Sequence, residues 1–269
     1  MTTLTDTEFG QFQRFIFEIA GITLTSAKKA LVSGRLAKRL QARRVNSYGD
    51  YFKLLASGQD ALEVQTAVDL LTTNETYFFR EPKHFQFLRQ YVTSAQVRGS
   101  AVRVWSAAGS TGEEAYSIAM LLSDCLAGQS WEVFASDIST RVLERARRGH
   151  YSMDRLGNFP PGYLQRFCLK GKGDQSGTML VERSVRNRVN FLQVNLNATL
   201  PRLGLFDVIF LRNVMIYFNT STKRQVVDRV LSLLKPGGYL FIGHSESLID
   251  VTESVDLVAP AIYRKSPRR

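Results

Sequence analysis

The stretch that most constrains the fold is residues 103–120, which read RVWSAAGSTGEEAYSIAM. It opens with the apolar pair Val104 and Trp105 and continues through small residues from Ser106 to Gly112. Apolar residues then recur at the spacing of a helix, at Ala115, Ile118, Ala119 and Leu122. The pattern predicts a strand, a tight turn and a helix. In a doubly wound sheet a ligand binds beyond the carboxyl end of such a strand, although simple packing of a helix on a strand explains the same pattern.

Acidic residues around this stretch narrow the choice of ligand. Asp137 ends the run EVFASD about 25 residues after Gly112, near the spacing at which an acid meets a ribose. Glu113 and Glu114 open the helix, where phosphate-binding loops leave the backbone amides free for an anion. Two carboxylates there repel a pyrophosphate and suit a cationic ligand. A ribose, no phosphate and a positive charge indicate S-adenosylmethionine rather than NAD or ATP.

From Val102 onward the sequence alternates between strand and helix patterns, which predicts an α/β fold with a mostly parallel sheet. The expected strands are 102–107, 132–137, 189–194, 207–212 and 239–243, the expected helices are 112–126, 139–148 and 221–234, and a hairpin is expected near 256–264. Residues 151–188 interrupt the alternation with two short strand-like runs around a Gly-rich turn, which predicts a small antiparallel insert. Ser139 is the expected cap of the helix 139–148.

Residues 1–90 read as helices and a linker, which leaves residues 91–269 for the α/β domain. Thr5 and Glu8 have the spacing of a capping box, and Gly21 is expected to end the first helix. Later helices are expected at about 26–44, 48–56, 61–71 and 83–97. The helix at 26–44 is strongly basic, with no acidic residue between Ile19 and Gly49. Such a face is usually only solvated, but the missing carboxylates and the net charge of +11 favour an acidic protein or nucleic acid as partner.

Two polar segments are candidates for the ligand site. In the linker LTTNETYFFREP, Asn74, Thr76 and Arg80 stand among aromatic residues. This segment is either an aromatic plug between domains or a lid that brings a guanidinium to the pocket. Arg212 closes a predicted buried strand, so it is expected at the ligand crevice. Tyr217, slightly further on, is either a core aromatic residue with a solvated hydroxyl or part of the site.

Composition excludes other classes of protein. The N-terminus has no positive region followed by an apolar core, and no apolar run approaches membrane-spanning length, so we expect neither a signal peptide nor membrane insertion. Cys125 and Cys168 lie in separate apolar contexts, as expected of free thiols in the cytoplasm. The histidines His84, His150 and His244 lack metal-ligand spacing, so we expect no metal site.

Five segments together resemble one known family. They read TTNETYFFRE, VWSAAGSTGEEAYSIAM, VFASDIS, FLRNVMIYF and LKPGGYLFIGHSES, within a match from about Phe15 to Tyr263. The sequence is similar to the chemotaxis receptor methyltransferase family, CheR. The resemblance implies a Rossmann-like class I methyltransferase domain with an N-terminal all-helical domain and an inserted antiparallel β-subdomain. It also implies S-adenosylmethionine as cofactor, S-adenosylhomocysteine as product, and methyl esterification of glutamate side chains on methyl-accepting chemotaxis receptors.

The resemblance also assigns roles to individual residues. The implied cofactor contacts are Asn74, Thr76, Arg80, Glu114, Asp137, Asn195, Leu196, Arg212 and Asn213. The implied catalytic residues are Arg80 and Tyr217, and the basic helix becomes a receptor surface with Arg35, Lys38 and Arg39 as contacts. Gly171 and Gly173 resemble the Gly-x-Gly turn of relatives that dock on a C-terminal receptor pentapeptide, so pentapeptide docking on the insert is expected.

This activity needs no strong general base, because a glutamate side chain with a reference pKa of about 4.3 is already ionised at neutral pH. Arg80 is expected to hold the substrate carboxylate, and the Tyr217 hydroxyl to orient it. Two alternatives stay open. A nucleic-acid methyltransferase fits the charge, but Arg212-Asn-Val-Met stands where an Asn-Pro-Pro-Tyr type sequence would hold a flipped base. A non-catalytic receptor adaptor that binds S-adenosylmethionine is the other. A dehydrogenase is disfavoured because the loop lacks Gly-x-Gly-x-x-Gly.

Overall fold

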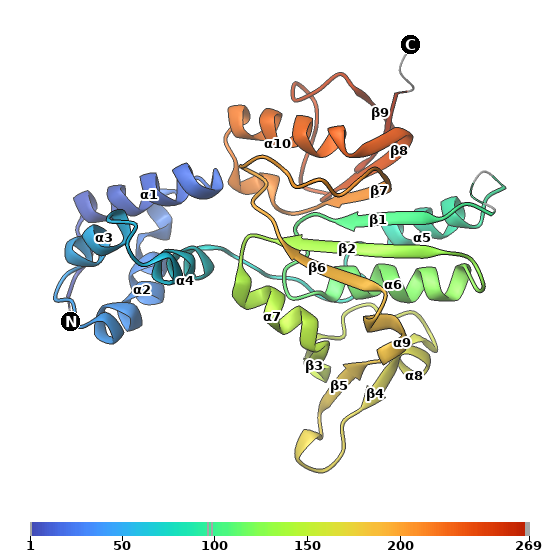
Figure 1. Ribbon diagram of the computed structural model, residues 1–269, viewed down its shortest axis with the longest axis horizontal. Helices are drawn as coiled ribbons and strands as arrows, with labels where there is room; N and C mark the ends of the chain where they lie inside the picture. Colours follow the sequence, from blue (N-terminus) through green and yellow to red (C-terminus); the bar gives the residue numbers. More distant parts are fainter. Residues whose placement is uncertain (1, 96, 98, 267–269) are drawn as a thin grey trace.

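The computed structural model describes residues 2–95, 97 and 99–266. Its centre is a seven-stranded sheet with the order β6-β2-β1-β7-β8-β10-β9 (Figure 1). The strands are β1 (Val102–Ser106), β2 (Trp131–Asp137), β6 (Val189–Gln193), β7 (Phe206–Leu211), β8 (Leu234–Ile242), β9 (Val255–Ala259) and β10 (Ile262–Lys265). The five strands from β6 to β8 pair in parallel, and β10 runs antiparallel to both of its neighbours. The predicted α/β fold with a mostly parallel sheet is confirmed.

Helices cover both faces of the sheet, which is why its central strands are apolar along nearly their whole length. Successive residues of β1 point to opposite faces: Val104 joins the core under α5 and α6, and Trp105 joins the core under α10. These helices are α5 (Pro82–Val92), α6 (Glu113–Cys125) and α10 (Thr220–Ser232), and α7 (Thr140–Arg148) packs on β2 and β6. No helix within the described ranges is both long and apolar enough to cross a membrane.

Two element boundaries differ from the sequence prediction by five residues each. The helix expected over 83–97 ends at Val92; residue 96 of that range lies outside the described residues. The strand expected from Tyr239 starts earlier, at Leu234, with a register irregularity against β7. Lys235 explains this early start, because its ammonium pairs with Asp207 of β7 at 2.7 Å and fastens the segment to the sheet.

The N-terminal helices have their own apolar core and lie at the carboxyl ends of the parallel strands (Figure 1). They are α1 (Asp6–Ala20), α2 (Lys29–Arg43), α3 (Tyr48–Ala56) and α4 (Ala61–Leu71), with a 3₁₀ turn, η1 (Ser26–Lys28), before α2. The predicted capping box is present, since Thr5 and Glu8 each bind the other's backbone amide. Gly21 ends α1 with φ of 71°, a conformation that favours glycine. The predicted helical N-terminal unit is thus confirmed.

The insert is a three-stranded antiparallel sheet beyond the β6 edge of the main sheet, with the order β3-β5-β4 (Figure 1). It contains β3 (His150–Ser152), η2 (Met153–Arg155), α8 (Tyr163–Phe167), β4 (Cys168–Lys170), η3 (Gly173–Gln175), β5 (Thr178–Val181) and α9 (Arg183–Arg186). The sequence predicted β4 and β5 but not β3, because β3 follows α7 after a single glycine and no longer turn marks it as a separate element. Cys168, on β4, and Cys125 are both free thiols.

Candidate active site

A cavity of about 290 Å³ lies where the N-terminal helices meet the carboxyl ends of the parallel strands. Its wall is built from the α1–α2 connection, the linker after α4, and the turns that follow β1, β2, β6 and β7. Every residue predicted to contact the cofactor or to act in catalysis lines it: Asn74, Thr76, Arg80, Glu114, Asp137, Asn195, Leu196, Arg212, Asn213 and Tyr217. The structure therefore gathers into one site residues that are spread over most of the sequence.

Only one of the two glutamates at the start of α6 faces this cavity. Glu114 lies in the wall, where Ser106 donates a hydrogen bond of 2.7 Å to its carboxylate. Glu113 is fully buried behind it and accepts a hydrogen bond of 2.6 Å from Thr111. Gly112, which precedes the pair, has φ of 97°, and a side chain there would collide with Ala146 of α7. The small residues in this turn thus serve close packing of α6 against α7 as well as access to the ligand.

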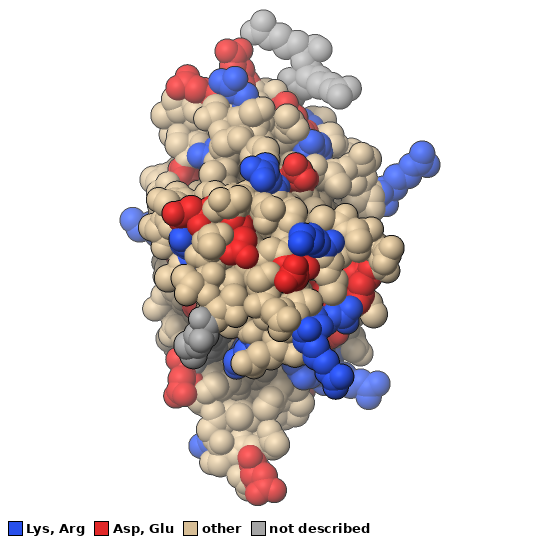
Figure 2. All heavy atoms as spheres, turned by 90° about the vertical axis from the view of Figure 1, so that its left-hand side faces the viewer, with Lys and Arg blue, Asp and Glu red and all other residues tan. Residues whose placement is uncertain are grey.

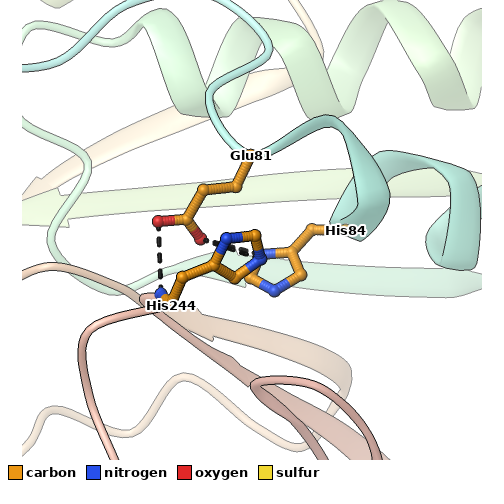
Figure 3. Close-up of side chains that lie close together, drawn as sticks. All are labelled: Glu81, His84 and His244. Atoms are coloured by element: carbon orange, nitrogen blue, oxygen red, sulfur yellow. Dashed lines mark hydrogen bonds and ion pairs between the residues drawn. The ribbon is translucent and has the colours of Figure 1, made fainter.

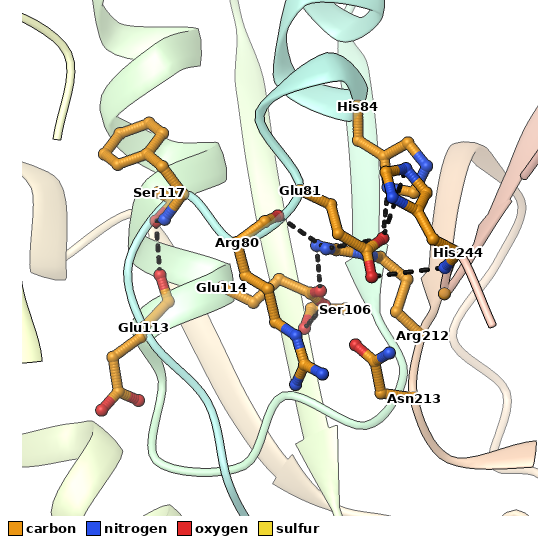
Figure 4. Close-up of polar contacts among 12 residues, drawn as sticks. Arg80, Glu81, His84, Ser106, Glu113, Glu114, Ser117, Arg212, Asn213 and His244 are labelled. Carbon is orange, nitrogen blue, oxygen red and sulfur yellow. Dashed lines mark hydrogen bonds and ion pairs between the residues drawn. The ribbon is translucent and has the colours of Figure 1, made fainter. Parts of the chain in front are cut away.

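Arg212 organises a buried charge network beside the cavity (Figure 4). Its side chain is 2% exposed and pairs with Glu114 at 2.8 Å and with Glu81 at 3.1 Å. It also donates a hydrogen bond of 2.6 Å to the backbone carbonyl of Arg80, which ties the linker to the turn after β7. Two carboxylates around one guanidinium leave the network with a net negative charge, which favours a cationic ligand in the cavity.

Asp137 ends β2 in the position expected of a hydroxyl acceptor. Its carboxylate is 8% exposed and accepts hydrogen bonds from the amides of Ser110 at 3.0 Å and Ser139 at 2.9 Å. Burial raises the pKa of this carboxyl to about 6, although the two amide hydrogen bonds act in the opposite direction. At neutral pH the group is therefore ionised and fixed in the cavity wall.

Arg80 and Tyr217 bring a guanidinium and a phenol to the same cavity. The Arg80 guanidinium points away from the Arg212 network (Figure 4) and donates to the carbonyl of Glu75 at 3.1 Å. No carboxylate in the described part of the chain pairs with it. The neighbouring Phe78 and Phe79 are fully buried, so the linker is an aromatic plug at these two residues and a site-forming segment at Arg80.

The turn that carries Tyr217 is held by the α1–α2 connection of the N-terminal unit. Its carbonyl accepts a hydrogen bond of 2.8 Å from the amide of Thr23, and Phe218 forms an isolated antiparallel bridge with Ile22 of the α1–α2 connection. The N-terminal unit is thus paired with the backbone of the site. Asn195 adds a further link, since its amide donates to the carbonyl of Ile19 at 2.7 Å.

Glu246 is a site-forming residue that the sequence analysis did not single out. Its carboxylate accepts hydrogen bonds from the amides of Gly243 at 2.7 Å, Asn213 at 2.8 Å and Ile216 at 3.2 Å. Burial raises the pKa of this carboxyl, and the amide hydrogen bonds oppose that rise. The available signal was an acid placed just after a buried strand, within the segment GHSES.

The three predicted receptor contacts on α2 have different surroundings. Lys38 is exposed, whereas Arg39 is half-buried and pairs with Glu63 of α4, with Nε 2.9 Å from the carboxylate. Arg35 is also half-buried and donates to the carbonyls of Thr72 at 2.8 Å and Leu70 at 3.1 Å. The absence of acids within this helix therefore does not leave it unneutralised, because other helices supply them. Figure 2, which faces the N-terminal helices, shows basic and acidic side chains interspersed.

Gly171 and Gly173 lie in the turn between β4 and β5 of the insert. A side chain at Gly171 would collide with the backbone carbonyl of Gln175. Gly173 has open space around it but a φ of 56°, which disfavours other residues. Both glycines are therefore required by the shape of the turn itself, whatever the insert binds.

Glu81, His84 and His244 lie close together although the sequence separates them (Figure 3). Their ligand-type atoms lie within 4.8 Å of one another. The Arg212 guanidinium stands 3.1 Å from Glu81 and opposes a cation at this place. Burial, and then the charge of Arg212, lower the pKa of His84 to about 4, so His84 is a neutral core residue at physiological pH.

The fold and the cavity define a class I S-adenosylmethionine-dependent methyltransferase. The model of the CheR methyltransferase all-alpha domain matches residues 7–72, and that of the CheR methyltransferase SAM-binding domain matches residues 74–263. The chain belongs to the CheR methyltransferase family.

Curated relatives agree with this assignment along nearly the whole chain. The chemotaxis protein methyltransferase of Escherichia coli (strain K12) is 44% identical over 98% of this chain and 92% of its own length. That of Salmonella typhimurium (strain LT2) is 42% identical over 98% and 91%. The solved structure of N-methyltransferase NodS from Bradyrhizobium japonicum WM9 is 15% identical, covers 70% of this chain and 97% of its own, and has a TM-score of 0.41. The family assignment rests on the sequence matches.

Proposed function

We propose that this methyltransferase esterifies glutamate side chains in the cytoplasmic domain of chemoreceptors. The observation that carries the proposal is the Arg80 guanidinium, which lines the cavity beside no partner carboxylate of the described residues. A carboxylate substrate supplies the missing anion. The names of the curated relatives support a role in chemotaxis, and the reducing cytoplasm suits the two free thiols.

The residues around the cavity suit the cofactor chemically. The net negative network of Glu114, Arg212 and Glu81 favours a positive charge, and ionised Asp137 is an acceptor for ribose hydroxyls. The other proposed contacts are Asn74, Thr76, Arg80, Asn195, Leu196 and Asn213. Bound there, S-adenosylmethionine supplies a methyl group on a sulfonium, and S-adenosylhomocysteine is the product.

The protein's own residues have the task of positioning rather than proton transfer. In this mechanism Arg80 binds the glutamate carboxylate, and the Tyr217 hydroxyl donates to one of its oxygens to fix its direction. With one oxygen held, the other oxygen of this already ionised carboxylate is left free as the nucleophile toward the methyl group that a bound cofactor would supply, so no base is needed. Alignment of the reacting atoms and exclusion of water lower the barrier by several kcal/mol.

Two surfaces are proposed to bind the receptor. Lys38 is the exposed cation of the three predicted on α2, while Arg35 and Arg39 shape the helix through internal contacts. On the insert, β4 is an edge strand of the β3-β5-β4 sheet, so its outer backbone groups are available to pair with a receptor's C-terminal pentapeptide. Gly171 and Gly173 set the turn beside this edge.

The test is transfer of labelled methyl from S-adenosylmethionine to a chemoreceptor cytoplasmic fragment, with tRNA and DNA in parallel reactions. Label on the receptor that mild alkali releases as methanol identifies a carboxyl methyl ester and supports the proposal. Alkali-stable label on nucleic acid would overturn the substrate and leave the family standing. Binding of both S-adenosylmethionine and receptor without any transfer would instead identify a non-catalytic adaptor.

A further inference from the structure

The amino end of helix α7 is capped from a distant part of the chain. Ser139 occupies the cap position, as predicted, but it makes no side-chain cap bond, and its buried hydroxyl has no hydrogen-bond partner in the described chain. Asp69 of α4 supplies the acceptor instead. Its carboxylate accepts from the amide of Thr140 at 3.0 Å, the amide of Arg141 at 3.2 Å and the Thr140 hydroxyl at 2.8 Å. The prediction for Ser139 is thus right in position and wrong in chemistry.

This cap lies next to the cavity wall, which includes Asp137 and Ile138. The amide of Ser139 binds the carboxylate of Asp137, and the next amide, that of Thr140, binds Asp69. Two consecutive peptide groups are therefore held by two carboxylates, one in the cavity wall and one in the N-terminal helices. Gln65 of α4 adds a third contact, because its amide donates to the carbonyl of Ile138 at 3.0 Å and to Asp69 at 2.8 Å.

We propose that Asp69 is a positioning residue for the cofactor, which holds the turn 137–141 so that the Asp137 carboxylate stays aimed into the cavity. The proposal rests on the proposed contact between Asp137 and the ribose. Asp69 is 7% exposed, so solvent does not replace it as an acceptor when it is lost. An asparagine in its place keeps one acceptor oxygen for the four donors that the Asp69 carboxylate serves, so the first amides of α7 lose part of their cap and the turn is held less firmly.

The N-terminal helices therefore do more than cover the cavity. Asp69 of these helices caps the amino end of α7, and the turn that leads into this end carries Asp137, the proposed acceptor of the ribose hydroxyls. Cofactor affinity should consequently depend on a residue that does not line the cavity, since Asp69 is absent from its wall.

The experiment compares Asp69→Asn with Glu63→Gln in the full chain. Glu63 is a matched control: it is a buried acid on the same helix, 3% exposed, but its partners Arg39 and Tyr51 belong to the N-terminal helices. We expect Asp69→Asn to raise the dissociation constant of S-adenosylhomocysteine, measured by calorimetry, about 5- to 10-fold. The KM for S-adenosylmethionine should rise in parallel, with kcat at saturation within about twofold.

Glu63→Gln should lower the thermal midpoint and leave the affinity for S-adenosylhomocysteine unchanged. An Asp69→Asn protein that melts earlier but binds normally would overturn the proposal, as would an equal loss of affinity in both variants. Thr140→Val, which removes only the hydroxyl donor, carries the test if Asp69→Asn does not fold: a dissociation constant raised about twofold supports the proposal, and an unchanged one overturns it.

Asp137→Asn, measured alongside, separates this proposal from the one on which it rests. If Asp137→Asn binds S-adenosylhomocysteine normally, the ribose contact is wrong and the positioning role falls with it. If Asp137→Asn binds weakly while Asp69→Asn binds normally, the ribose contact stands and only the positioning role of Asp69 is wrong.

Discussion

The turns after β2 and after β7 face the same cavity but are held in opposite ways. The turn 137–141 is fixed by Asp69, which comes from the N-terminal helices. The turn 213–217 is fixed by Glu246, which follows the neighbouring strand β8 of the same sheet. N-terminal contacts reach this second turn mainly through the backbone, at Thr23 and Ile22. The turn that carries Asp137, the proposed ribose acceptor, therefore depends on a side chain from the N-terminal helices, whereas the turn that carries Tyr217, proposed to contact the substrate, depends on the sheet. Changes at the two turns should therefore act mainly on cofactor affinity and mainly on turnover, respectively.

The largest expected effect on turnover comes from the two residues proposed to hold the substrate carboxylate. Arg80→Ala should lower kcat about 100-fold, because the substrate carboxylate loses its paired hydrogen bonds and its alignment. Tyr217→Phe, which removes only the hydroxyl, should lower kcat about tenfold. Both are measured by methyl transfer to a receptor fragment at saturating S-adenosylmethionine. Full turnover in either variant would remove that residue from the proposed mechanism, and calorimetry with S-adenosylhomocysteine checks that the cofactor still binds.

Glu246→Gln should destabilise the turn 213–217 and leave the turn 137–141 unchanged. An amide cannot accept from all three backbone donors, so we expect a loss of stability of about 2 kcal/mol and a kcat about tenfold lower. Asn213 of this turn is one of nine proposed cofactor contacts, so the dissociation constant of S-adenosylhomocysteine should rise less than about fivefold, a smaller change than that in kcat. Glu253→Gln, an exposed acid further along the same connection, is the control and should behave as the parent. If Glu246→Gln lowered affinity and turnover equally, the separation between the two turns would be wrong.

The pH dependence of cofactor binding tests the role of Asp137 in the turn 137–141. With a pKa of about 6, roughly one tenth of Asp137 is ionised at pH 5, so the dissociation constant of S-adenosylhomocysteine should rise about tenfold between pH 7 and pH 5. In the cofactor-free protein the raised pKa of Asp137 acts in the opposite direction, because it makes the folded state more stable at low pH than at neutral pH. Its contribution is fully present below the unfolded value of 3.8 and is lost as the pH rises through about 6. Asp137→Asn should bind weakly at every pH; a parental profile in that variant would assign the titration to another group.

The smallest expected effect lies outside both turns, on α2. Lys38→Glu should raise the KM for the receptor about threefold at low salt, and less at high salt, since an exposed charge acts mainly on encounter. The affinity for S-adenosylhomocysteine should not change. Lys53→Glu on the neighbouring helix α3 makes the same change in net charge and should leave the receptor KM unchanged. Equal effects of both variants would show that overall charge, rather than this place on α2, controls the encounter.

The sequence predicted the parts of this molecule that depend on local patterns. The strand, turn and helix around Gly112, the capping box at Thr5 and the parallel sheet follow from periodicity, small residues and caps that lie close together in the chain. The short β3 was missed because only a single glycine separates it from α7. The neutralisation of α2 by Glu63 was missed because the acid belongs to another helix.

The residues of the site fall into the same two groups, those that local patterns predict and those that only the fold reveals. Asp137, Glu114 and Arg212 follow or flank predicted strands, so topology alone places them at one edge of the sheet. Asp69 and Glu246 act through backbone amides of other segments, and although Glu246 follows a predicted strand, no spacing in the sequence marks the amides that either residue binds. Arg80 was a candidate in the linker, but only the fold shows that its carbonyl binds the Arg212 network while its guanidinium lines the cavity.

The pairing of Ile22 with Phe218 has a consequence for how the chain folds during synthesis. The N-terminal helices have their own core and are synthesised before the rest of the site, yet Phe218, with which Ile22 pairs, comes 196 residues later in the chain. At about 5–20 residues per second, on the order of 10–40 s separates the synthesis of the two partners. During that interval the backbone groups of the α1–α2 connection that later pair with Tyr217 and Phe218 are bound to water. The cavity is therefore among the last features to form in the nascent chain.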